Sequence, residues 1–149
     1  MVDIVNLKKN NKVIYPVTHE KSIIYDEKEM VLQASGIFVP YGMGESKPII
    51  LKVGSMVELY GAYKNTVEIP SGELGNVPKT IVELPLWAKP RYPVRRLVQS
   101  SHTQMFWLSV DYVGGRVLLQ MARYRSANSE GFTSCPANSY LTISCNYIV

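Results

Sequence analysis

The sequence has few of the residues that build metal centres or disulfide frameworks. Its 149 residues include two cysteines and two histidines. Cys135 and Cys145 are separated by nine residues with no histidine nearby, which is not a metal-ligand spacing. The sequence therefore predicts no metal site and no cofactor, and we expect both thiols to be free in a reducing compartment.

Long apolar runs are also missing. No stretch approaches the ~18 uninterrupted apolar residues that a membrane-spanning helix requires. The first residues, Met1-Val2-Asp3, lack the basic start and the apolar run of a signal peptide. We therefore expect no signal peptide, no membrane association and folding in the cytosol.

The side chains of a catalytic centre are not grouped in the sequence. His102 follows Ser100-Ser101, but neighbouring residues of an extended strand point to opposite faces, and there is no G-x-S-x-G motif. The few aspartates are far apart, and the glutamates fall at positions typical of solvated faces and loops. A pair of facing carboxylates for glycoside hydrolysis is therefore not evident. The sequence predicts no catalytic residue and no enzyme.

Positive charge is modest and scattered. The formal net charge is +4, and the densest basic cluster consists of Lys89, Arg91, Arg95 and Arg96, with prolines within or beside it. Aromatic side chains at the spacing of a base-stacking platform are missing. The sequence therefore predicts no nucleic-acid partner.

What the chain does have is β-forming sequence. Ten tyrosines and runs of Val, Ile and Thr favour strands, and the length suits one domain with a single core. Besides a central hairpin, strands are predicted at residues 34–40, 48–53, 56–65, 79–84, 94–99 and 139–149. Gly61 is expected to mark a bulge or a close-packed position, and prolines 85, 90 and 93 predict an extended crossing segment. The predicted fold is all-β, an antiparallel sandwich or jelly roll.

The central hairpin runs from Met105 to Arg125 and turns at Gly114-Gly115. Adjacent glycines accept the positive φ angles of a type I′ turn, which sets the register of the two strands. The predicted cross-strand pairs are Tyr112–Val117, Val110–Leu119, Leu108–Met121 and Phe106–Arg123 on one face, and Asp111–Leu118, Ser109–Gln120, Trp107–Ala122 and Met105–Tyr124 on the other. The first face is almost wholly apolar, so we expect it to face the core.

The second hairpin face is the candidate binding surface. It combines aromatic planes with oriented polar groups, the mixture that suits the C–H face and the hydroxyls of a sugar. The candidate ligand-binding residues are Trp107, Tyr124, Asp111 and Gln120. The competing interpretation is that these aromatic side chains pack against a second sheet or a neighbouring subunit.

The N-terminal part is more polar and less regular. Residues 13–17 contain Pro16, which denies a ladder hydrogen bond, so they predict an edge strand or an extended arm. Residues 22–33 fit either a short helix or a loop between two short strands. We expect residues 1–33 to form an arm for attachment and trimerisation that gains order from a neighbour, and residues 34–149 to form a β head.

Several stretches together resemble a known family. They are residues 53–62, Leu84-Pro85, Arg91-Tyr92-Pro93, Trp107-Leu108 with the turn Gly115-Arg116-Val117, residues 136–141 leading to Asn146-Tyr147, and residues 11–19. This pattern resembles the head domain of tail-fibre and baseplate receptor-binding proteins of long-tailed phages, and of tail-like bacteriocins, of Gram-positive bacteria. The turn reads Gly114-Gly115 where the family often has Asp-Gly, and residues 139–142 replace a common Trp-Leu-Pro stretch.

The resemblance implies a homotrimer in the virion tail, assembled in the host cytoplasm. Its heads would contact cell-wall saccharide or teichoic acid, and its arm other tail or baseplate proteins. Because such heads vary most where they bind, the resemblance transfers no site residue. A structural adaptor of the baseplate that binds no saccharide is the alternative, and a wall-polymer hydrolase is a third interpretation.

Overall fold

A computed structural model describes residues 7–9, 12–14, 28–32, 36–42, 48–70, 78–101, 104–123 and 134–149. In chain order its elements are β1 (Leu7–Lys9), β2 (Lys12–Ile14), β3 (Lys28–Val31), β4 (Phe38–Pro40), β5 (Ile49–Val53), β6 (Met56–Asn65), β7 (Lys79–Leu84), the 3-10 turn η2 (Leu86–Ala88), β8 (Val94–Gln99), β9 (Met105–Val113), β10 (Arg116–Arg123) and β11 (Tyr140–Ile148). Every strand pairing in these ranges is antiparallel. The prediction of an all-β, antiparallel fold is confirmed.

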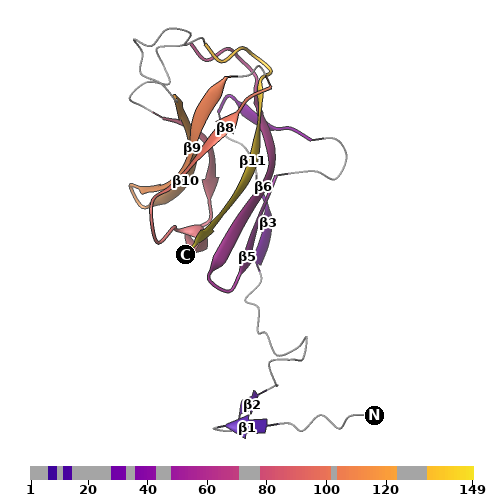
Figure 1. The fold of residues 1–149 in the computed structure, drawn as a ribbon, viewed down its shortest axis with the longest axis vertical. Helices are drawn as coiled ribbons and strands as arrows, with labels where there is room; N and C mark the ends of the chain where they lie inside the picture. The colour runs from indigo at the N-terminus through magenta and orange to yellow at the C-terminus, as the bar shows by residue number, and fades with distance from the viewer. Residues whose placement is uncertain are drawn as a thin grey trace.

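Two sheets face each other and enclose one core. One sheet has the strand order β7-β10-β9-β8, and the other has the order β11-β6-β5-β3, with β4 also paired to β6. Figure 1 shows the two sheets side by side, and the small ladder of β1 and β2 apart from them. A single cluster of buried side chains draws on both sheets, including Ile81, Phe106 and Leu119 from one and Ile50, Leu59 and Ile143 from the other.

The β9–β10 hairpin matches its prediction. Gly114 and Gly115 have φ angles of 58° and 82°, as a type I′ turn requires, and the pairs within the described strands have the expected register. The inward side chains Phe106, Leu108, Val110, Val117, Leu119 and Met121 are all buried. Tyr112, which the same pattern places on the core face, is 46% exposed because it lies beside the turn, beyond the opposing sheet's cover.

The last strand alternates strictly between core and solvent. In β11 the inward residues Leu141, Ile143, Cys145 and Tyr147 are buried, and the residues between them are exposed. β11 pairs along its whole length with β6. The thiols of Cys135 and Cys145 are free, as expected, and both are buried.

Gly61 is a close-packed position in β6. One edge of β6 pairs with β5 over residues 56–60 and with β4 over residues 63–65, so Gly61 lies between the two partner strands. Its φ is +119°, and a Cβ built there would lie 2.5 Å from the Cα of Pro48. The backbone approach therefore requires glycine on two counts, conformation and space.

Part of the expected arm belongs to the larger sheet. β3 pairs with β5, and the next residue, Leu32, donates its N–H to the carbonyl of Pro48 at 2.8 Å and is 2% exposed. The described part of residues 22–33 is thus a strand, not a helix. The cause is non-local, because β5 offers a free sheet edge that the local pattern could not reveal. Residues 15–27 lie outside the described residues.

The predicted extended crossing contains a helical turn. Pro85 has φ −62°, and Ala88 donates its N–H to the Pro85 carbonyl at 2.9 Å, which closes η2. The prediction of a wholly extended crossing was therefore wrong, because Pro85 favours the start of a helical turn as well as an extended chain. The carbonyl of Ala88 accepts a hydrogen bond of 2.9 Å from the buried Tyr147 hydroxyl.

Candidate functional site

The outer face of the four-stranded sheet holds most of the predicted site. Trp107 and Asp111 lie on β9 and Gln120 on β10, and all three are half-buried on this face. Trp107 lies opposite Ala122 on β10 and opposite Leu97 on β8, whose side chain is 41% exposed. Tyr124 lies outside the described residues. The three described residues therefore share one surface, as predicted.

These residues form an elongated surface. Trp107 and Asp111 are four residues apart on one strand, a separation of about 14 Å at ~3.4 Å per residue. Gln120 lies opposite Ser109, so it is the diagonal neighbour of both Trp107 and Asp111, at about 7–8 Å. Such spacing suits an extended chain with several units better than a single sugar ring.

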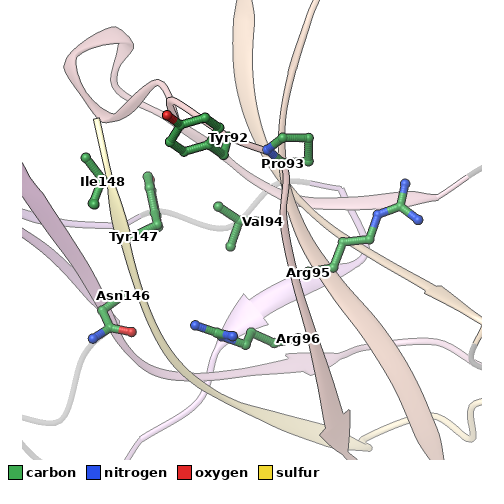
Figure 2. A pocket seen from close by; sticks show the side chains of 8 residues that line it. All are labelled: Tyr92, Pro93, Val94, Arg95, Arg96, Asn146, Tyr147 and Ile148. Carbon is green, nitrogen blue, oxygen red and sulfur yellow. The ribbon is translucent and has the colours of Figure 1, made fainter.

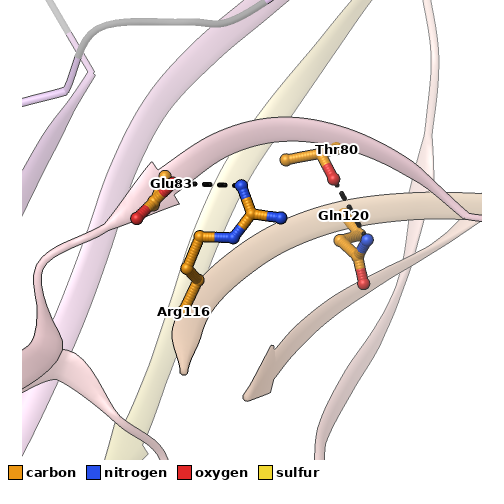
Figure 3. A network of polar contacts seen from close by, with 4 residues as sticks. All are labelled: Thr80, Glu83, Arg116 and Gln120. Atoms are coloured by element: carbon orange, nitrogen blue, oxygen red, sulfur yellow. Dashed lines mark hydrogen bonds and ion pairs between the residues drawn. The ribbon is translucent and has the colours of Figure 1, made fainter. Parts of the chain in front are cut away.

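Polar groups on this face are oriented by one another (Figure 3). Gln120 donates from Nε2 to the Thr80 hydroxyl at 3.1 Å, and the Ser109 hydroxyl donates to Asp111 Oδ2 at 2.6 Å. A β-bulge between Leu119 and Gln120 shifts the register of β10 against β7. The surface therefore presents fixed hydrogen-bonding groups beside Trp107.

A second surface, the tyrosine face, lies on the outside of the five-stranded sheet. Tyr41, Tyr60 and Tyr140 border a hollow of about 410 Å³ over Gly61 and the outward residues of β11. Tyr41 and Tyr140 stack with ring centroids 4.9 Å apart, and the Lys64 ammonium lies 5.7 Å above the Tyr41 ring. All three tyrosines are exposed in the single chain.

Apolar exposure continues beyond the tyrosines. Met56 and Ile148 are cross-strand partners on the same face, and both are exposed. The sequence predicts a strand that contains Tyr140 but does not join it to Tyr41 or Tyr60. The available signal was tyrosine at outward positions of two strands, and the two tyrosines come to border one hollow only because β6 pairs with β11.

A third feature is a slot between β8 and β11, the strands at which the two sheets meet. The slot has a volume of about 290 Å³ and is lined by residues 92–96 and 146–148. Figure 2 shows Arg96 reaching across it toward Asn146, with Tyr92 at one end, whereas Arg95 points away. The basic cluster is evident in the sequence but the slot is not, because β11 is remote from β8 in the chain.

Other kinds of site find no support in the described residues. No group of three or more His, Cys, Asp or Glu side chains is placed there to hold a metal ion. Within the same ranges, no helix has the length and apolar character to cross a membrane. No family model matches the chain, and no curated protein or solved structure is significantly similar to it.

Proposed function

We propose that the protein is the receptor-binding head of a phage tail fibre or of a tail-like bacteriocin, which adheres to cell-wall saccharide or teichoic acid without catalysis. The observation that carries the proposal is the half-buried Trp107 beside exposed Leu97, with the polar groups of Ser109, Asp111 and Gln120 held in fixed positions along the same face. An aromatic plane among oriented hydrogen-bonding groups is the chemistry that binds sugars. The family resemblance of the sequence supports the same assignment.

The proposal includes a jelly-roll-like homotrimer. Its support is the tyrosine face, where Tyr41, Tyr60 and Tyr140 are exposed around one hollow. Met56 and Ile148 are exposed on the same face of the sheet, beyond the pair Glu58–Asn146. Several large apolar side chains exposed on one face are typical of protein–protein contact surfaces. Three copies would carry three wall-binding surfaces, and multivalent engagement raises avidity by roughly 10²–10⁴ over a single site.

The test measures adsorption of the purified protein to cell walls from Gram-positive bacteria stripped stepwise of their polymers. Trp107→Ala should abolish adsorption while the oligomer mass and the melting temperature stay nearly unchanged. Tyr112→Ala is the control, because it removes an exposed aromatic side chain at the hairpin turn, away from the proposed surface. Its adsorption should equal that of the wild type.

Other outcomes contradict the proposal in distinct ways. If Trp107→Ala first breaks the oligomer, Trp107 is interface packing and the wall-binding surface is elsewhere. If the wild type binds no walls at any salt concentration but captures a tail protein, the adaptor function replaces adhesion. Release of soluble wall fragments by the wild type would instead indicate a hydrolase.

A further inference from the structure

The slot between β8 and β11 is formed by two strand edges that approach without pairing. At one end Ser100 bridges to Leu141, and Ser101 donates its N–H to the Tyr140 carbonyl at 3.0 Å. At the other end Arg91 donates its N–H to the Ile148 carbonyl at 2.9 Å. Between these closures no ladder joins β8 to β11 in the described part of the chain. The edges therefore border a slot that is closed at both ends.

Arg96 occupies the middle of this slot. Its register partner is the buried Leu108, so Arg96 projects from the inward face of β8, the face that elsewhere carries core residues. Because β8 is an edge strand, the side chain reaches solvent through the slot and extends toward Asn146 (Figure 2). Burial raises the pKa of the Cys145 thiol, and the nearby Arg96 guanidinium opposes that rise. An arginine thus stands where an apolar residue would continue the core pattern.

The charge of Arg96 has no acidic counterpart in the described residues. Neither Arg96 nor Arg95, Arg91 or Lys89 has a carboxylate within ion-pair distance there. Lys89 and Arg91 lie over the rings of Tyr112 and Tyr92 at 4.0 and 5.7 Å. Of these cations only Arg95 and Arg96 border the slot, and the Arg95 side chain points away from it (Figure 2). Arg96 is therefore the residue that gives the slot its positive potential.

We propose that this slot is an anion site centred on Arg96, which takes a phosphodiester group of an extended wall polymer. A guanidinium binds two phosphate oxygens through parallel N–H donors, and the Asn146 amide faces it from the opposite strand. Tyr92, which is exposed at the end of the slot, offers a ring face for the C–H groups of the adjoining polyol or sugar. This inference rests on the proposed function and specifies its ligand as a phosphate-bearing polymer.

The dimensions and position of the slot suit a chain. The two closures lie seven residues apart along β11, about 24 Å at ~3.4 Å per residue. Arg96 and Leu97 are adjacent on β8 and point to opposite faces, and Leu97 pairs with Trp107. A polymer that crosses β8 would contact the arginine on one side of this edge strand and the Trp107 surface on the other.

The test measures affinity for a poly(glycerol phosphate) oligomer by calorimetry, with the full chain in its native oligomeric state. Arg96→Gln should weaken binding at least tenfold, and Arg96→Lys should restore only part of it, because lysine lacks the bidentate fork. Arg116→Gln is the matched control: it removes the same charge from an exposed pair with Glu83, at 3.7 Å on a strand away from the slot. Its affinity should change less than twofold, and melting curves should show all three variants folded.

Several results would overturn the inference. Equal losses of affinity in Arg96→Gln and Arg116→Gln would indicate diffuse charge. Equal affinity of the wild type for polygalacturonate would indicate a carboxylate site. Equal affinity of the wild type for poly(dT) would indicate a nucleic-acid site. If the wild type binds walls both before and after acid removal of their phosphodiester polymers, the phosphate site is wrong while adhesion stands. If it binds no walls at all, the proposed function fails instead.

Discussion

Tyr63 and Tyr147 are buried tyrosines whose hydroxyl groups differ in their hydrogen bonding. The Tyr147 hydroxyl donates to the carbonyl of Ala88, whereas the Tyr63 hydroxyl has no hydrogen-bond partner among the described residues. A buried polar group without a partner loses its hydration and gains nothing in exchange. The Tyr147 hydroxyl therefore stabilises the folded state, whereas the Tyr63 hydroxyl destabilises it.

Replacing each tyrosine by phenylalanine tests this difference. Tyr147→Phe should lower the free energy of unfolding by about 0.5–1.5 kcal/mol, because a satisfied hydrogen bond is lost. Tyr63→Phe should leave it unchanged or raise it, because an unsatisfied hydroxyl is removed without changing the ring. Urea denaturation of both variants measures the effect. Equal destabilisation by the two changes would contradict the prediction.

Stability at alkaline pH is a second residue-scale prediction. Burial raises the pKa of Tyr147, with a smaller contribution from Cys145, and burial also raises the pKa values of Tyr63, Cys135 and Cys145. The unfolded chain releases these protons at its ordinary pKa values, about 8.5 for Cys and 10 for Tyr. The stabilisation that the folded state gains from keeping these four groups protonated is therefore complete below about pH 8. It is lost progressively as the pH rises above that value.

The measurement is the urea midpoint between pH 7 and 11. The midpoint should decline above about pH 9, and Tyr63→Phe should show a shallower decline than the wild type. A midpoint that is constant over this range would show that the neutral forms are not favoured by folding.

At the scale of the element, the β9–β10 hairpin depends on its turn. Gly114 has φ 58°, a left-handed conformation that β-branched side chains rarely adopt. Apart from its two chain neighbours, no residue has an atom within 4 Å of the position its Cβ would take. Any effect of a side chain there must therefore come from the backbone conformation and not from steric contact with neighbours.

Two substitutions at Gly114 separate these causes. Gly114→Val should destabilise by about 1–2 kcal/mol through backbone strain. Gly114→Asn should be close to neutral, because asparagine tolerates the left-handed region and is favoured in type I′ turns. Thermal melts of both variants provide the comparison, and equal melting temperatures would show that the turn relaxes to another type.

At the scale of the whole molecule, the tyrosine face predicts self-association. Light scattering at micromolar concentration should give the mass of a trimer, and Tyr140→Glu should shift it toward the monomer. Tyr140 pairs across strands with Lys64, so a glutamate there has a nearby cation and the fold should tolerate it.

Tyr112→Glu is the matched control for this substitution. Tyr112 is 46% exposed against 39% for Tyr140, and it also has a lysine beside it, Lys89. Its variant should keep the mass of the wild type. A monodisperse wild-type monomer, or dissociation of both variants alike, would exclude the tyrosine face as the trimer contact.

The sequence by itself determined strands β4 to β11, the hairpin register and the inward faces of β9 and β10. These follow from alternation with a period of two and from the glycine pair at the turn, both of which act within a few residues. Trp107, Asp111 and Gln120 could be assigned to one face for the same reason. The close packing at Gly61 was also predicted from local sequence.

Only the tertiary structure decided which distant strands became neighbours. Pairing of β6 with β11 brings Tyr60 and Tyr140 to the border of one hollow. The meeting of β8 with β11 places Arg96 opposite Asn146, about fifty residues later in the chain. The inclusion of β3 in the larger sheet has the same origin. Strand pairing depends on open sheet edges and on the fit of two whole sheets, and neither is encoded in the alternation of any single segment.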